Sequence, residues 1–102
     1  MKRDVVYIMS NKHRTVLYIG VTSNLTQRRL QHRAEAADEG FCGKYRIVDV
    51  IYVERYHDIV EAIAREKQLK RLKRAAKERL IRQRNPSILS LAPPIFLMPD
   101  ER

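Results

Sequence analysis

Two short runs rich in β-branched and aromatic residues constrain the fold of this chain most strongly: DVVYIM at 4–9 and TVLYIGV at 15–21. Both have the composition of β-strands, and the short polar stretch SNKHR joins them. The sequence therefore predicts that the chain begins with an antiparallel β-hairpin.

The position of the turn decides which residues of this hairpin face each other. A turn centred between Lys12 and His13 gives pairing partners whose residue numbers sum to 25. Tyr7 then lies directly opposite Tyr18, on the same face of the sheet. A slip of one residue would move one of the two tyrosines to the other face.

The segment that follows, 22–40, predicts a helix capped by Asn24 and ended by Gly40. Its apolar side chains share one side, which we expect to face the core: Leu30, Ala34 and Ala37. Arg28 and His32 are four residues apart and lie on a different side of this helix.

Further elements follow in the second half of the chain. Residues 45–56 predict a third strand, with Ile47, Ile51 and Val53 on one face. A long helical pattern runs from Asp58, its expected cap, to Arg84, with a break expected between residues 72 and 76. Asn85-Pro86 ends it, because proline disfavours helical backbone in the residue before it.

Length and composition indicate one compact domain, residues 1–91, followed by a proline-rich tail, residues 92–102. No apolar run approaches the roughly 20 residues needed to span a bilayer, and the N-terminus lacks a signal-peptide pattern. Cys42 is the single cysteine, so we expect a reducing, cytoplasmic location. We also expect a monomer without an obligate protein partner.

Positive charge is concentrated in one segment. The net charge is +9, and residues 65–84 carry ten Lys or Arg against Glu66 and Glu78, a local charge of +8. Such a basic stripe is typical of proteins that bind a polyanion, because each phosphate contact releases a counterion. A solvated helix face is the alternative, and an anionic membrane fits less well because the stripe lacks a broad aromatic face.

Glu66 is the most unusual acidic residue in the sequence. It falls in the middle of the apolar stripe formed by Ile59, Ala62, Ile63 and Leu69. A carboxylate in that position needs a partner, because burying an uncompensated charge is costly. The partner is either a nearby Lys or Arg or a hard cation such as Mg²⁺.

Four further residues gather around the strand-to-helix connection after Gly20. Arg28 suits bidentate contact with phosphate, and His32 can transfer a proton or donate to a phosphate oxygen. The plainer interpretation is that Arg28 and His32 are surface residues and that Tyr7 and Tyr18 only pack within the sheet. Gly20 favours a functional one, because it leaves room for a backbone or ligand to approach closely.

These spaced residues resemble the GIY-YIG nuclease superfamily, and the small single-domain bacterial members most of all. The resemblance spans residues 4–91 and rests on Val5-Val6-Tyr7, Tyr18-Ile19-Gly20, Arg28, His32, and Glu66 within AREKQLK. The chain departs from the family in three places. Val5-Val6 replaces Gly-Ile, Cys42-Gly43 replaces the usual Thr and Lys, and the Trp and Asp expected after Asn85-Pro86 are absent.

The resemblance implies an α+β fold, with a small three-stranded antiparallel sheet flanked by helices. It also implies hydrolysis of phosphodiesters with one divalent cation, Mg²⁺ or Mn²⁺, bound by Glu66. Tyr18 would position or deprotonate the attacking water, with Tyr7 beside it, and Arg28 would neutralise charge on the phosphate. His32 matches a helix histidine of variable role, and Gly20 and Asn85 would help to close the site.

The sequence therefore favours a metal-dependent endonuclease acting on nucleic acid, with DNA as the expected substrate. The alternatives are a non-catalytic nucleic-acid-binding module that kept the fold, and a protein-interaction role through the apolar tail patch at 95–98. A pure binding module has no use for a carboxylate among phosphates, which would repel them. The basic side chains expected to contact nucleic acid are Lys44, Lys67, Lys70, Arg71, Lys73 and Arg74.

Overall fold

The computed structural model describes residues 4–35 and 46–91, except for the side chains of Thr26, Arg29, His32, Arg33 and Glu35. The elements, in chain order, are β1 (Asp4–Ser10), β2 (Leu17–Thr22), α1 (Leu25–Glu35), β3 (Asp49–Tyr56), α3 (Ile59–Arg71) and α4 (Arg74–Arg84).

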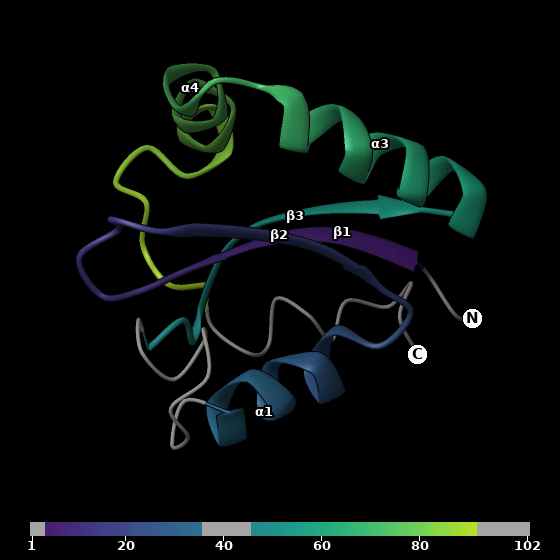
Figure 1. Cartoon of the computed structure of the whole chain (residues 1–102), viewed down its shortest axis with the longest axis horizontal. Helices are drawn as coiled ribbons and strands as arrows, with labels where there is room; N and C mark the ends of the chain where they lie inside the picture. The colour runs from purple at the N-terminus through teal and green to yellow at the C-terminus, as the bar shows by residue number, and fades with distance from the viewer. Residues whose placement is uncertain (1–3, 36–45, 92–102) are drawn as a thin grey trace.

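The three strands form one antiparallel sheet in the order β2-β1-β3, so β2 is an edge strand. Helix α1 covers one face of this sheet, and α3 lies against the other face with α4 beside it (Figure 1). This is the expected α+β architecture. Within the described residues, no helix is both long enough and apolar enough to cross a membrane.

The hairpin forms as predicted, but its register differs by two residues. Tyr7 pairs with Gly20, and Tyr18 pairs with Met9, so partner numbers sum to 27. The reason lies in the loop, where Asn11 Oδ1 accepts from the backbone N–H groups of Thr15 and Val16 at 2.9 and 3.1 Å. Because side chains alternate with a period of two, a shift of two residues keeps both tyrosines on one face, as diagonal neighbours.

A β-bulge in β3 changes the expected face of one core residue. Ile8 pairs with Tyr52 and Met9 with Val50, which leaves Ile51 as an extra residue between them. The prediction that Ile47, Ile51 and Val53 share a face is therefore wrong. Ile51 points to the face covered by α3 and α4, and the other two lie on the face covered by α1.

The two faces of the sheet carry two separate hydrophobic cores. The core on the α3 and α4 side contains Val6, Ile8, Ile19, Ile51, Tyr52, Ala62, Leu69, Ile81 and Ile88. The core on the α1 side contains Val5, Tyr7, Met9, Leu25, Ile47, Val50 and Val53.

The side of helix α1 that faces the sheet is not the side that the sequence predicted. Leu25 is its buried residue, whereas Leu30 is 58% exposed and Ala34 is also exposed. The polar residue Arg28, three positions after Leu25, bonds to the sheet and fixes this rotation. Ala37 lies outside the described residues.

The long helical pattern divides as expected. Asp58 caps α3 by accepting from the N–H of Val60 at 2.9 Å, and the chain is extended at Leu72 and Lys73. Helix α4 then runs in a clearly different direction from α3 (Figure 1) and ends at Asn85. The segment after it stays attached to the sheet through a hydrogen bond from Leu91 N–H to the carbonyl of Val50 at 2.8 Å.

A buried carboxylate fastens α3 to β3, and nothing in the sequence pattern revealed it. Arg65 binds Glu54 with two hydrogen bonds, from Nε to Oε1 at 2.9 Å and from Nη2 to Oε2 at 3.0 Å. The hydroxyls of Tyr52 and Tyr56 donate to the same carboxylate. Burial alone would raise the pKa of Glu54, but these donors outweigh burial and lower it below its usual 4.5.

We predict that Glu54→Gln lowers the free energy of unfolding by about 3 kcal/mol at pH 7, because it leaves Arg65 without its carboxylate partner. The pKa of Glu54 is lowered in the folded state, so its contribution is present above pH 4.5 and is lost as the pH falls further. Urea unfolding of both proteins at several pH values should therefore show the difference shrinking in acid.

Glu61→Gln is the matched control, since Glu61 is an exposed carboxylate of α3, the helix that carries Arg65. We expect it to change stability little at any pH. A Glu54→Gln difference that stayed constant down to pH 2 would contradict the role given to the charge.

Candidate active site

Gly20 allows the closest approach in the sheet. Tyr7 is fully buried, and its ring lies over Gly20, its partner on β2. A Cβ atom at Gly20 would overlap the hydroxyl oxygen and Cζ of Tyr7. The glycine is therefore required for space, because its φ is not positive.

Three residues predicted for the site meet beside this glycine. Arg28 donates from Nε to the Tyr7 hydroxyl at 3.1 Å, and from Nη1 to Oε1 of Gln31 at 3.1 Å. The rings of Tyr7 and Tyr18 are stacked, with centroids 6.5 Å apart and planes 29° apart. The structure thus brings together a guanidinium and two phenols at the edge strand.

The connection between β2 and α1 places Arg28 at this point. Asn24 caps the helix as predicted, its Oδ1 accepting from the N–H of Gln27 at 3.0 Å. Thr22 Oγ1 accepts from the N–H of Asn24 at 3.1 Å and tightens the turn. The helix therefore starts directly after the strand, and Arg28 lies in its first turns, above the ring of Tyr7.

Burial is the main influence on the hydroxyl of Tyr7. It raises the pKa of Tyr7 above its usual value of 10, and the charge of Glu66 contributes in the same direction. The hydrogen bond and positive charge of Arg28 act in the opposite sense but do not overcome burial. Tyr7 therefore keeps its proton at neutral pH.

Glu66 lies on α3, which packs against the face of the sheet opposite to α1 (Figure 1). Its side chain is 17% exposed, and Oε2 lies 3.4 Å from Nζ of Lys70, one turn later. The ion pair considered as one alternative from the sequence thus exists, but its lysine is 55% exposed. The charge of Glu66 is the smallest of the influences that raise the pKa of Tyr7.

Asn85 occupies a structural position rather than one in this cluster. Its Nδ2 donates to the carbonyl of Ile51 at 3.0 Å and to that of Leu89 at 2.8 Å. Its Oδ1 accepts from the N–H of Leu89 at 3.0 Å. Asn85 thus satisfies the carbonyl of the bulged residue and fastens the segment after α4 to β3.

Two predicted residues cannot be placed in the site. His32 lies in α1, four residues after Arg28, but its side chain is not among those described. Lys44 lies outside the described residues.

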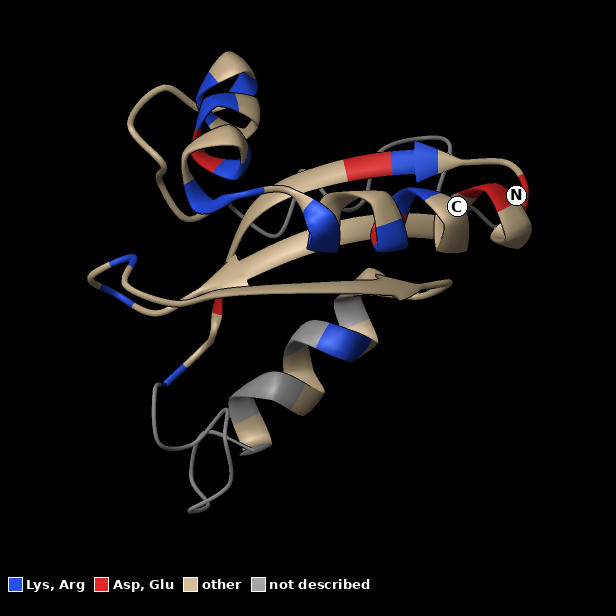
Figure 2. Cartoon of the chain, turned by 45° about the horizontal axis from the view of Figure 1, so that its top comes forward, with Lys and Arg blue, Asp and Glu red and all other residues tan. Residues whose placement is uncertain are grey.

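Most of the predicted nucleic-acid contacts lie on α3 and around its end, where Figure 2 colours parts of the ribbon blue, and their side chains are exposed. They are Lys67, Lys70, Arg71 and Lys73. Arg74 instead holds the β1–β2 loop, donating to the carbonyls of Arg14 and Thr15 and pairing with Glu78 at 2.8 Å. Arg84 is also exposed but contacts β3, donating to the carbonyl of Val53 at 2.8 Å and lying over the ring of Tyr52.

The protein supplies few ligands for a metal. Among the described residues, no three His, Cys, Asp or Glu side chains gather closely enough to hold an ion. Glu66 alone among the predicted site residues carries a carboxylate. This donor set suits Mg²⁺, which is usually bound by one or two carboxylates together with waters and substrate phosphates.

Comparison with known proteins agrees with this geometry. Residues 4–79 match the family described as the GIY-YIG catalytic domain. The chain is 31% identical over 86 residues to a UPF0213 protein of Syntrophus aciditrophicus, covering 84% of this chain and 97% of that protein. It is 36% identical over 76 residues to a UPF0213 protein of Natronomonas pharaonis, covering 74% and 87% respectively.

A solved structure shares the fold. The solution NMR structure of a UPF0213 protein from Bacillus halodurans superposes with a TM-score of 0.53 at 22% identity, covering 83% of this chain and 88% of that one. The arrangement of three strands and flanking helices is therefore found in a solved relative.

We predict that Gly20→Ala destabilises the protein by about 1–3 kcal/mol, because the added methyl group overlaps the Tyr7 ring. Tyr7→Leu alone should also destabilise it, by leaving a cavity. In the double variant the shorter side chain at position 7 makes room for the methyl group. The double variant should therefore lose less stability than the sum of the losses in the two single variants. Additive losses in urea unfolding would show that the ring does not require the glycine.

Proposed function

Because the chain belongs to the GIY-YIG catalytic domain family, we propose that it is a metal-dependent endonuclease that hydrolyses phosphodiester bonds of nucleic acid, with DNA as the expected substrate. The meeting of Tyr7, Tyr18 and Arg28 beside Gly20 carries this proposal. A nuclease needs a positively charged group and oriented hydroxyl groups at the point where a phosphate is attacked. At this edge of the sheet Arg28 carries the positive charge, and Tyr7 and Tyr18 carry the hydroxyl groups.

Arg28 would stabilise the negative charge that develops on the phosphate. Its guanidinium is always charged and is already held by Tyr7 and Gln31, so little reorganisation is needed when the reaction occurs. The bond from Nε to Tyr7 aims the rest of the planar group away from the core.

The two tyrosines would orient the attacking water. Tyr7 accepts a hydrogen bond from Arg28 Nε and retains its own proton, so the phenol and the guanidinium hold each other in place. Tyr18 is half-buried and stacks against it at the edge of the sheet, where substrate can reach it. We assign water positioning to Tyr18, with Tyr7 as its rigid support.

Glu66 would be the protein's ligand for Mg²⁺ or Mn²⁺. A single, partly buried carboxylate fits a cation that takes its other ligands from water and phosphate. When bound, such a cation would polarise the phosphate and offset its charge. Lys70 neutralises Glu66 in the metal-free protein and, being largely exposed, can turn away from it.

A non-catalytic nucleic-acid-binding module remains the alternative function. The exposed basic side chains of α3 would serve either function. The cluster of Tyr7, Tyr18 and Arg28 favours the enzyme, because a binding module has no need for hydroxyl groups held beside a guanidinium.

We predict that the wild-type protein cuts at least one of duplex, branched or single-stranded DNA when Mg²⁺ is present. Glu66→Gln should abolish cleavage, because it removes the carboxylate that binds the cation. Its binding without metal should hold or increase, since a repulsion between carboxylate and phosphate is relieved. Gel assays of cleavage and fluorescence anisotropy of binding measure the two effects.

The control for this variant is thermal stability. The pair between Glu66 and Lys70 is largely solvated on the lysine side, so its loss should cost about 0–1 kcal/mol. A Glu66→Gln protein that is strongly destabilised yet still cuts DNA would disprove the metal assignment. A wild-type protein that binds every substrate and cuts none would favour the binding module.

We predict that Arg28→Lys slows cleavage much more than it weakens binding. Lysine keeps the positive charge but loses Nε and the planar fork, so neither the Tyr7 bond nor bidentate contact with phosphate can form. Single-turnover rates and binding constants of both proteins provide the comparison. Equal losses in rate and affinity would make Arg28 a binding residue only.

A further inference from the structure

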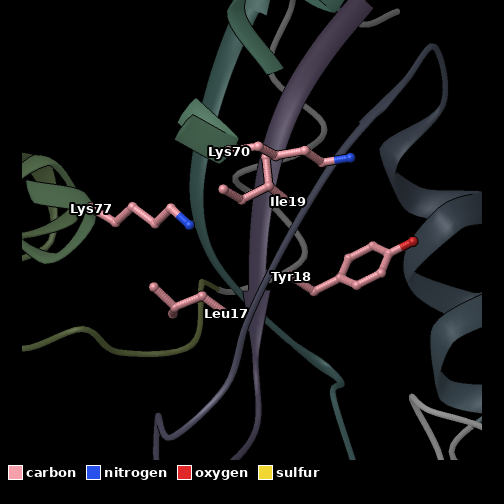
Figure 3. A pocket seen from close by; sticks show the side chains of 5 residues that line it. All are labelled: Leu17, Tyr18, Ile19, Lys70 and Lys77. Carbon is pink, nitrogen blue, oxygen red and sulfur yellow. The ribbon is translucent and has the colours of Figure 1, made fainter. Parts of the chain in front are cut away.

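A pocket lies beside the candidate site, on the opposite face of the edge strand. It is lined by Leu17, Tyr18, Ile19, Lys70 and Lys77 and has a volume of about 250 Å³ (Figure 3). Ile19 is nearly buried and Leu17 is partly buried, so the floor is apolar. The lining residues include two ammonium groups and no carboxylate.

The break between α3 and α4 brings the two lysines to one pocket. In an unbroken helix, side chains seven residues apart lie two turns apart and project in parallel, with about 10 Å between them. Here the chain is extended at Leu72 and Lys73, and α4 takes a new direction. Lys70 and Lys77 consequently reach the pocket from two different helices, as Figure 3 shows.

Lys70 links this pocket to the catalytic carboxylate. Its Nζ is 3.4 Å from Glu66, and the same side chain lines the pocket. Tyr18 belongs to both places, because its backbone borders the pocket while its ring extends toward α1 (Figure 3). An anion at the Lys70 ammonium, which extends toward the side on which the Tyr18 ring lies (Figure 3), is therefore adjacent to the position where cleavage would occur.

We propose that this two-lysine pocket binds one backbone phosphate of the nucleic acid, next to the phosphate that is cleaved. The ammonium groups of Lys70 and Lys77 neutralise that single phosphate, and the apolar floor of Leu17 and Ile19 accepts the attached sugar. An apolar floor also strengthens attraction between opposite charges, because it excludes water. The position of this phosphate relative to the scissile bond rests on the proposed function, whereas binding in the pocket does not.

The first test is the salt dependence of binding without metal. Affinity for a labelled DNA duplex is measured at several salt concentrations for the wild type, Lys70→Gln, Lys77→Gln and the double variant. Each phosphate contact contributes roughly 0.9 to the slope of log affinity against log salt. Because both lysines share one phosphate, we expect the double variant to lose about one unit of slope, with strongly non-additive effects of the single changes.

Lys12→Gln and Arg79→Gln form the matched control pair. Both residues are exposed cations, they lie on separate elements, and neither lines the pocket. The double control removes the same charge, so any effects of its two changes should add. If the Lys70 and Lys77 double variant lost two units of salt slope, with additive effects of the single changes, the lysines would make two independent surface contacts. If its salt slope were unchanged, the pocket would not contact the DNA. Either result overturns the proposal.

The second test locates the phosphate. On an oligonucleotide with a mapped cleavage position, a neutral methylphosphonate replaces one phosphate at a time beside the scissile bond. At one neighbouring position it should slow the wild type, yet have little further effect on the double variant. Equal slowing of both proteins at every position contradicts the proposed location. If no DNA is cut, the proposed function fails, and the salt experiment still decides whether the pocket binds phosphate.

Discussion

The ring of Tyr7 crosses from β1 over β2 at Gly20, and the candidate site depends on this contact. Any larger residue at Gly20 would meet the hydroxyl oxygen and Cζ of Tyr7, so the ring could not lie flat at this place. With the glycine in position, the hydroxyl reaches the hydrogen-bonding range of Arg28 and the ring stacks on Tyr18. A residue without a side chain thus determines where three functional side chains meet.

The second face of the sheet is organised by charged contacts of a different kind. Glu54 and Arg65 attach α3 to β3, and Arg74 attaches the start of α4 to the β1–β2 loop. These bonds hold both helices against the sheet on either side of the break at Leu72 and Lys73. Several positive charges of the basic segment therefore help to maintain the fold, while others, such as Lys67 and Arg71, are exposed.

The sequence predicted the shared face of the two tyrosines correctly, but it did not predict their contacts. Tyr7 and Tyr18 were expected on one face, and they are, although their register differs by two residues because Asn11 extends the loop. The bulge at Ile51 was not predictable, since its backbone carbonyl is satisfied by Asn85, 34 positions away in the sequence. The apolar pattern also did not predict which side of α1 faces the sheet. The hydrogen bond from Arg28 to Tyr7 sets that side and places Leu30 in solvent.

Several features could be predicted from the sequence alone: the order of strands and helices along the chain, the caps at Asn24 and Asp58, the break before α4 and the accumulation of positive charge. These features follow from local periodicity, side-chain caps and proline, which act within a few residues. Three features depend on the packing of separate elements: the bond of Arg84 to the carbonyl of Val53, the pairing of buried Glu54 with Arg65, and the pocket that Lys70 and Lys77 both line. Such contacts depend on the angles at which separate elements pack, and no short stretch of sequence specifies those angles.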